Sequence, residues 1–478
     1  MIEKFRYSKL ARAASALACI GLASCAVGPD FAPPPAPATP RFTPEQTASP
    51  GGGQHFREGA EAPAQWWRAF RSERLNRLID AALAQNPTIE AADAAIRVAQ
   101  FNSDAATGTF LPQIGLSSNS SYIYSSGAST TTTVTQTAYS FFTKQVTVSF
   151  TPDVWGGNRR LVESLDAETE VARYQKRAAH LTLAANVAKA AIEEASLRAQ
   201  IVVTQRLIDI QQERLLLVER QLAGGAIAEA DVLLQQTALA QTRQTLPPLE
   251  TRLAQTRNLL TALAGLYPVD EVSETFELSG LALPRDLPLS LPSQVVEQRP
   301  DIKAAEAQIH AAGARIGVAL AARLPNIVLT ANGGSSALQI ARLFAPGTNY
   351  YTLAGNIAQP LFDGMTLLNK QRAAEAGFDQ AEAQYRATVV NAFQNVADSL
   401  RALQGDAQNV RHARAAENAA KKYLAKIRLQ QKLGAVSQLA VVDAQRAYLA
   451  SSLIRVQSEA LRFTNTVALF TALGGGGW

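Results

Sequence analysis

The 478-residue chain has few of the residues from which redox, metal and hydrolytic sites are built. It contains two cysteines, and its four histidines stand singly, so no paired-cysteine centre or His-Glu-x-x-His zinc motif can be found. Phosphate-binding loops and Gly-x-Ser-x-Gly nucleophile elbows are also missing. The carboxylates lie in helical patterns beside Lys and Arg, which is typical of a solvated surface. The sequence therefore indicates a protein that is not an enzyme and has no cofactor.

Charged residues are scarce as well, at 18% of the chain, whereas apolar residues reach 47%. The formal net charge of +5 does not indicate an acidic partner, because the first 24 residues hold four basic residues and only one acidic residue. Without them the net charge is about +2, so the composition gives no support to nucleic-acid binding.

Residues 1–24 have a basic start, an apolar stretch and a small-residue end. This is the pattern of a secretory signal peptide, and the apolar stretch is too short to cross a membrane. Residues 22–25 (LASC) are similar to a bacterial lipobox, which predicts a covalent lipid on Cys25; the alternative is an ordinary cysteine beside a plain cleavage site. Because Cys19 leaves with the signal peptide, the mature chain cannot form an intrachain disulfide.

Residues 25–63 are rich in Pro, Gly and Ala and can bury little apolar surface, so we expect an extended tether between the lipid and the body. Trp66, Trp67 and Phe70 follow and precede an apolar helical pattern. We expect these aromatic residues to anchor the first helix on the body rather than to bind a ligand.

The chain carries an internal duplication. Residues 86–93 (NPTIEAAD) recur as 299–306 (RPDIKAAE), and residues 110–114 (FLPQI) recur as 323–327 (RLPNI), in both cases 213 positions later. Several elements that repeat at one spacing indicate that a whole structural unit is repeated.

The correspondence continues towards the end of each half. Residues 222–227 (LAGGAI) match residues 431–436 (QKLGAV) at an offset of 209. We therefore expect the repeats 64–282 and 283–478 each to run helix, strand, loop, strand, very long helix, turn and helix.

The strands are predicted from alternating patterns. Residues 89–110 and 302–324 contain no proline and are expected to be helices that end before Pro112 and Pro325. The segments that follow alternate apolar and polar residues around two expected loops, 125–137 and 333–347. The apolar positions are Ile114, Leu116, Tyr122, Tyr124, Val146, Val148 and Phe150 in the first half and Ile327, Leu329, Leu353 and Ile357 in the second.

Strands of this length with one apolar face are typical of a transmembrane barrel, although the same periodicity fits a half-buried sheet in a soluble domain. Four strands cannot close a barrel, and a sheet in lipid has to close because lipid offers no partner to its edges. Self-association is therefore expected. Two chains would give an eight-stranded barrel filled by its own side chains, and three would give twelve strands and leave a lumen.

Residues 155–222 contain no Pro and almost no Gly, which predicts a helix of about 68 residues and roughly 100 Å. Heptad seams rich in alanine predict close helix packing. Glycines at 224, 225 and 434 should fold each long helix back onto a partner, and Pro247-Pro248 should bend only the first return helix. Coiled-coil seams alone suit a periplasmic scaffold or adaptor without a pore; the strand pairs favour a channel. The seam positions are Leu181, Ala185, Ala188, Ile192, Ala195, Ala199 and Val202, and then Val389, Phe393, Val396, Leu400 and Leu403.

These collinear features resemble the outer-membrane efflux proteins, the lipoprotein exit ducts of tripartite drug and metal pumps. The motifs that carry the resemblance are Cys25, 66–67 (WW), 153–159 (DVWGGNR), 299–302 (RPDI) and 472–476 (ALGGG).

The resemblance implies a mainly α fold with a membrane β-barrel, formed by a homotrimer with twelve strands and with helical hairpins that build an α-barrel in the periplasm. It implies outer-membrane lipid, a periplasmic adaptor and an inner-membrane RND pump as partners. The duct would conduct compounds passively, and the pump would select the cargo.

The resemblance also implies a gate near residues 428–446. Asp443 and Arg446 match the acidic and basic residues that hold the family's tip shut, with Leu439 as an apolar constriction. The alternative for the charged residues is a local i,i+3 pair on a solvated helix, worth a few tenths of a kcal/mol. The turns at Gly224, Gly225 and Gly434 would contact the adaptor. The family often has Tyr three residues before the hairpin Gly, where this chain has Gln431, so we expect part of the locking network to be weaker or rerouted.

Overall fold

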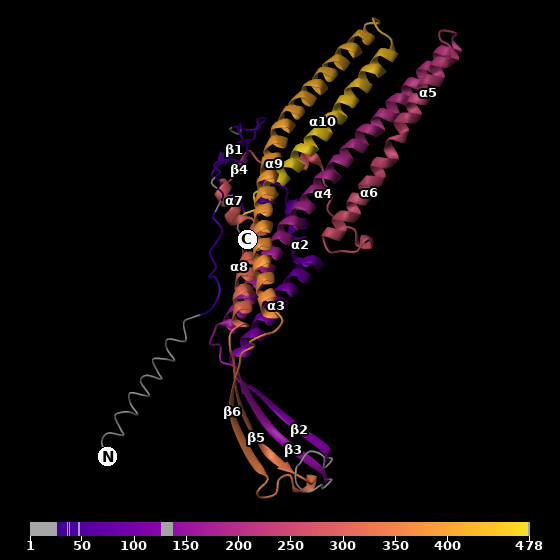
Figure 1. Ribbon diagram of the computed structural model, residues 1–478. Coiled ribbons are helices and arrows are strands. Elements are labelled where there is room, and N and C mark those ends of the chain that lie inside the picture. Colours follow the sequence, from indigo (N-terminus) through magenta and orange to yellow (C-terminus); the bar gives the residue numbers. More distant parts are fainter. Residues whose placement is uncertain (1–25, 36, 38, 46–47, 126–136, 477–478) are drawn as a thin grey trace. The chain divides into compact units, whose positions relative to one another are not determined.

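The computed structural model describes residues 26–476 apart from 36, 38, 46–47 and 126–136 (Figure 1). The predicted signal peptide 1–24, Cys25 and most of the predicted loop 125–137 lie outside the described residues. The chain divides into two compact units, each built from segments of both halves. Unit 1 contains Ala95–Ala172, Ala305–Tyr385 and the described residues up to Pro34; unit 2 contains Pro35–Ala94, Arg173–Ala304 and the chain from Arg386 onwards.

Unit 1 contains a four-stranded antiparallel sheet in the order β2-β3-β5-β6, which confirms the predicted strand pairs. Its register places Ile114 opposite Val148 and Ile327 opposite Ile357, so the apolar positions of all four strands share one face. The strands are β2 Gln113–Ser125, β3 Thr137–Phe150, β5 Asn326–Ala337 and β6 Asn349–Ala358.

Among the residues that the structure describes, none covers the apolar face of this sheet. Leu116 is 81% exposed and Tyr351 is 82% exposed. At the two edges, β2 has only β3 as a neighbour and β6 has only β5 within the part of the chain that the structure describes. The sheet therefore ends in unpaired backbone N–H and C=O groups on both sides.

The predicted loop 333–347 is wrong at its start, because β5 continues to Ala337. Gly334 faces Gln145 in the ladder, and a Cβ atom at Gly334 would clash with the carbonyl oxygen of Lys144. The glycine therefore marks a close approach of β3 rather than the end of a strand. The turn between β5 and β6 comes later and contains the short 3-10 helix η6, Ile340–Arg342.

Four helices each begin in one unit and end in the other, because the unit boundaries fall within their sequences. The two longest each have 67 residues, which confirms the predicted long helix in each half. The two shorter ones end before Pro112 and Pro325, as predicted, the first of them through the 3-10 helix η2 (Gly108–Phe110). The four are α3 Pro87–Thr107, α4 Gly157–Ala223, α8 Pro300–Ala321 and α9 Thr366–Lys432.

In unit 2 the long helices fold back onto return helices. The first return path is broken into α5 (Glu229–Gln244) and α6 (Leu246–Leu263) at Pro247-Pro248, whereas α10 (Gln438–Ala472) is continuous over 35 residues. This confirms the predicted difference between the halves, since proline lacks the N–H that an uninterrupted helix needs. Figure 1 shows both hairpin turns at the same end of this unit.

The core of unit 2 gathers around the aromatic residues that precede the first full helix. Trp66 and Phe70, in the 3-10 helix η1 (Trp66–Phe70), are fully buried, and Trp66 stacks on Phe470 of α10 with ring centroids 5.6 Å apart. Helix α2 (Glu73–Gln85) adds its apolar side to the same core. The predicted aromatic anchor is confirmed. Most positions of the two predicted heptad seams pack here, but Ala199 and Val389 are not part of this cluster and Val202 is exposed.

Smaller elements complete unit 2. Strand β1 (His55–Glu58) pairs in parallel with β4 (Asp286–Leu289), and helix α7 (Pro292–Gln298) follows. The described residues of the predicted tether are bound to the body: Arg462 donates from Nε to Gln54 Oε1 at 2.8 Å and from Nη2 to Gly51 O at 2.7 Å. These contacts bind the end of the segment to the body, and its role as a tether stays a prediction. Short 3-10 helices η4 (Pro268–Asp270) and η5 (Leu278–Gly280) lie in the connection between the repeats.

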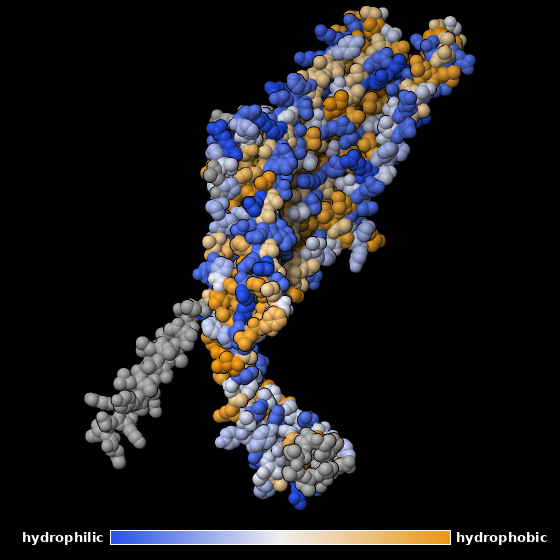
Figure 2. Space-filling model, in the orientation of Figure 1, coloured by the Kyte–Doolittle hydropathy of each residue, from blue (hydrophilic) through white to orange (hydrophobic). Residues whose placement is uncertain are grey.

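Polar and apolar residues are interleaved along the helical hairpins in Figure 2. Among the helices of the described residues, none is both long and apolar enough to cross a membrane.

Candidate functional site at the helix-hairpin tips

The two hairpin turns have the same backbone geometry. Gly225 has a φ of +71° and Gly434 a φ of +76°, backbone angles that residues other than glycine rarely adopt. At the first turn the N–H of Ala226 donates to Gln221 O, and at the second the N–H of Ala435 donates to Gln430 O, both at 2.9 Å. This is the Schellman ending of a helix, which satisfies carbonyls that would otherwise be orphaned.

Gly224 has no left-handed φ, so of the three predicted turn residues only Gly225 and Gly434 require glycine for their backbone. All three are exposed at the ends of the hairpins, where the structure leaves them accessible to a partner. Their role in contacting an adaptor stays a prediction.

Asp443 does not pair within its own helix. Its Oδ1 lies 3.0 Å from Nη1 of Arg214 on α4, so the ion pair joins the second hairpin to the first. The side chain of Asp443 is 48% exposed and that of Arg214 is 24% exposed. An ion pair at this exposure contributes about 0.2–1 kcal/mol. The Nε atom of Arg214 is buried and has no hydrogen-bond partner among the described residues, so the guanidinium is only partly satisfied.

A second link runs beside the first. Gln431 Nε2 donates to Gln438 Oε1 at 3.0 Å, and Gln438 Nε2 donates to Glu213 Oε1 at 3.0 Å. Gln431, at the position where the family often has Tyr, therefore takes part in a relay from the end of α9 through the start of α10 to α4. The relay and the Arg214–Asp443 pair use neighbouring residues of α4, and we call these two links together the tip latch.

The other two predicted gate residues lie on α10 near Asp443. Arg446 is exposed and forms no hydrogen bond or ion pair with the residues that the structure describes. The local Asp443–Arg446 pair considered as an alternative is thus not formed in this chain. Leu439 is half-buried and stands outside the apolar cluster that packs α9 on α10, as far as that cluster is described. The cluster comprises Leu424, Ile427, Val441 and Ala444, with Val436, Ala440 and Tyr448 against it.

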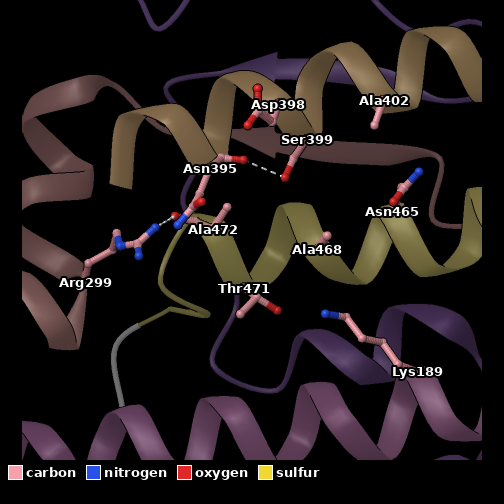
Figure 3. A pocket seen from close by; sticks show the side chains of 10 residues that line it. All are labelled: Lys189, Arg299, Asn395, Asp398, Ser399, Ala402, Asn465, Ala468, Thr471 and Ala472. Carbon is pink, nitrogen blue, oxygen red and sulfur yellow. Dashed lines mark hydrogen bonds between the residues drawn. The ribbon is translucent and has the colours of Figure 1, made fainter. Parts of the chain in front are cut away.

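A polar cavity of about 350 Å³ deeper in unit 2 is a weaker candidate (Figure 3). Several of its polar groups already take part in hydrogen bonds of the fold: Ser399 donates to Asn395 O, Thr471 donates to Val467 O, and Arg299 Nη1 donates to Ala472 O at 2.7 Å. Arg299 lines the cavity, but its guanidinium is bonded to the last residue of α10. The cavity is therefore formed mainly where helix ends are held together, and Lys189 alone does not make a binding site.

Metal binding finds no site in the described part of the chain, where no group of three or more His, Cys, Asp or Glu side chains lies close enough to hold an ion. The buried charges have structural partners. Glu194, fully buried, accepts from Arg198 and from Arg257, and Arg257 also donates to Val272 O at 2.7 Å. This cluster holds the connection between the repeats on α4.

The sequence did not predict the contacts made by Arg214, Glu213 and Gln438. Arg214 is one of many charged residues on α4, and its partner lies 229 positions away in the other half. No local pattern distinguishes it, and its equivalent position in the second repeat, Tyr423, is not charged.

An open antiparallel sheet with an exposed apolar face, joined in a duplicated chain to long helical hairpins, defines a class of envelope channel proteins rather than a soluble coiled coil. The family described as outer membrane efflux protein matches residues 78–266 and 291–475, one stretch in each predicted repeat. The chain belongs to this family.

Individual relatives agree. The chain is 30% identical over 432 residues to the pyoverdine export outer membrane protein OpmQ of Pseudomonas putida, covering 86% of this chain and 88% of that one. It is 27% identical over 459 residues to the probable outer membrane lipoprotein SilC of Salmonella typhimurium, covering 95% and 96%. The solved outer-membrane channel OprN superposes with a TM-score of 0.83 over 95% of this chain and 99% of its own, at 23% identity. The protein is thus an outer-membrane channel component of an efflux system, and its relatives are transport proteins.

Proposed function

We propose that the protein is one protomer of a lipid-anchored homotrimeric exit duct, which passively conducts compounds delivered by an inner-membrane RND pump and its periplasmic adaptor. One observation carries the proposal: the four-stranded sheet has an exposed apolar face and two unpaired edges. Membership of the outer membrane efflux proteins supports it.

Closure of the sheet requires other copies of the chain. Each unpaired backbone group costs several kcal/mol in lipid, so β6 of one copy would pair with β2 of the next. Three copies give twelve strands with room for a lumen, whereas two give a barrel that its own side chains fill. A channel requires a lumen, so an assembly of three copies is favoured over one of two.

The gate of the duct is proposed at the hairpin tips. Asp443 and the relay through Gln431 hold the second hairpin against α4 within one chain. Arg446 is exposed and uncommitted, so in a closed trimer it is available to an acidic or carbonyl partner on a neighbouring copy. Leu439 would form the apolar constriction. Each contact is weak enough to break, which suits a tip that has to open.

The adaptor would contact the exposed turns at Gly224, Gly225 and Gly434. A covalent lipid on Cys25 would anchor the chain, and transport would involve no catalysis and no cofactor, in line with relatives that are transport proteins.

Planar-bilayer conductance together with the mass of the detergent-extracted protein tests the proposal. We expect a particle of three protomers plus detergent, and channels with discrete steps that require the intact trimer. A monodisperse monomer that leaves the bilayer sealed would rule out the duct.

A further inference from the structure

The first described residues, Ala26 to Phe31, are bound inside unit 1. The N–H of Val27 donates to Trp155 O at 3.1 Å, and Trp155 Nε1 donates to Pro325 O at 2.8 Å. Trp155 precedes α4 and Pro325 precedes β5, so the segment is held where two connections between helices and strands meet.

Arg160 of α4 makes most of the polar contacts with this segment. Its Nε donates to Val27 O at 3.2 Å, and its Nη2 donates to Gly28 O at 3.3 Å and to Asp30 Oδ1 at 2.7 Å. Nη1 donates to Glu163 Oε2 at 2.8 Å. The side chain of Arg160 is only 6% exposed, whereas that of Asp30 is 96% exposed. The buried partner therefore belongs to the body and the solvated partner to the segment.

Glycines allow the segment to approach closely. Gly28 has a φ of +105°, and a Cβ atom there would lie 2.6 Å from the Cα of Gly317 on α8. A Cβ at Gly317 would lie 2.6 Å from Val27 O, and one at Gly156 would lie 2.6 Å from Cα of Ala26. Such distances are incompatible with any side chain, so both surfaces are shaped for this contact.

An aromatic contact ends the bound segment. Phe31 stacks on His310 of α8, with ring centroids 4.2 Å apart and planes inclined by 16°. His310 Nε2 lies 2.9 Å from Oε1 of Glu163, the same carboxylate that binds Arg160. One acidic side chain thus positions both the cation and the ring that hold the segment.

Binding of residues 26–31 gives the Arg160 guanidinium hydrogen-bond acceptors that it would lack if the segment were absent. Burial alone would lower the pKa of Arg160, but its hydrogen bonds to Asp30 and Glu163 outweigh this effect and raise the pKa. Without the segment, the guanidinium would lose three of its acceptors while its aliphatic stem stays packed in the body. A buried donor without a partner is unfavourable, so the site favours occupation.

We propose that α4 and α8 form a receptor for residues 26–31, which fixes the start of the mature chain beside the strand connections without the help of a lipid. Recognition requires a glycine at position 28, a carboxylate at position 30 and an aromatic ring at position 31. Any group attached to residue 25 would then be positioned by its neighbour Ala26, which the receptor holds in place. The receptor goes beyond the proposed duct and does not depend on conduction.

A lipid-free protein tests the receptor. The first 25 residues are replaced by a cleavable signal of a non-lipoprotein, so that the mature chain starts at Ala26 and contains no cysteine. Ala32→Cys, at an exposed position, then carries a nitroxide label. We expect an immobile component in its spectrum, and loss of this component with Arg160→Ala and with Gly28→Ala. Arg315→Ala, which removes an α8 arginine paired with Glu168 instead, should leave the spectrum unchanged.

Gly28→Ala changes only the bound segment, so it keeps the test valid if Arg160→Ala fails to fold. A label that is mobile in the lipid-free parent would mean that the lipid, not the receptor, holds the segment. A label that stays immobile in both Arg160→Ala and Gly28→Ala would also overturn the proposal. Because the spectrum reports the segment alone, a failure of trimer formation or conduction would be seen separately.

Discussion

Arg299 and Asn86, which occupy the same position in the two repeats, bind equivalent carbonyl groups with different side chains. Arg299 Nη1 donates to Ala472 O at the end of α10, and Asn86 Nδ2 donates to Leu263 O at the end of α6 at 2.8 Å. The repeated motif before each proline is thus a helix-end clamp. In each repeat it joins the start of a short helix to the end of the return helix.

The clamp predicts a stability loss in Arg299→Ala. The substitution leaves the carbonyl of Ala472 without its donor and Asp301 without its bidentate partner, which costs about 1–3 kcal/mol for the buried acceptor. Denaturant unfolding should show a lower midpoint. Arg401→Ala, which removes an exposed arginine paired with Glu45, should shift the free energy of unfolding by less than about 0.5 kcal/mol. Equal midpoints for the two variants would mean that the clamp does not hold α10.

Much of the fold could be predicted because it is set locally. Helix length follows from the absence of Pro and Gly, turns follow from glycines with positive φ, and strands follow from alternation. Contacts between residues far apart in the sequence could not be predicted. The parallel pair of β1 and β4 joins two four-residue strands more than 200 positions apart. Gly334 lies in a strand and not in the predicted loop, because its glycine serves the close approach of β3.

The candidate site shows the same limit. The glycine turns at Gly225 and Gly434 could be found from local conformation, whereas the partner of Asp443 could not, because it lies in the other repeat. Cys25 lies outside the described residues, so the lipid attached to it stays a prediction. The boundaries of the repeats, 64–282 and 283–478, also stay predictions.

The lipid prediction can be tested directly. Cys25 is the one candidate for acylation in the mature chain, so Cys25→Ser should take up no labelled fatty acid, as measured by metabolic labelling and immunoprecipitation. Membrane association should persist in part, because the strands also bind the membrane. Continued labelling of the variant would disprove the lipobox assignment.

Asp406 predicts a specific pH dependence. Burial raises the pKa of this carboxyl group, and a hydrogen bond from Asn465 and the charge of Arg462 offset only part of the shift. A carboxyl with a raised folded pKa binds its proton more tightly in the folded chain. Its contribution to stability is therefore full below the unfolded pKa of about 3.8 and is lost as pH rises through the folded pKa.

The measurement compares Asp406→Asn with the parent by thermal unfolding between acidic and neutral pH. The amide cannot titrate but can still accept from Asn465. We expect the stability of the variant relative to the parent to rise as pH increases from 4 to 7. A relative stability that falls over this range would show that Arg462 holds the carboxyl ionised, with a depressed pKa.

The tip latch predicts how the gate responds to mutation. If the charged contacts of three copies act together and supply about 1.4 kcal/mol in total, Asp443→Ala with Arg446→Ala should raise the open probability in planar bilayers about tenfold. Removing both residues eliminates the two charges in the first turns of α10, although Arg214 then loses its partner. Arg214→Ala should therefore open the channel in the same direction, because it breaks the same link from α4.

A matched control separates gating from helix destabilisation. Glu382→Ala with Arg386→Ala removes an exposed acidic and an exposed basic residue of α9 and should leave conductance unchanged. Gln431→Ala, which breaks only the relay to Gln438 and Glu213, should give a smaller rise than the charged double variant. If the Asp443 and Arg446 variant conducts like the parent while the trimer and its membrane insertion are intact, the charges are surface features. The constriction should then be sought at Leu439, where Leu439→Ala would widen an apolar ring and raise conductance without changing any charge.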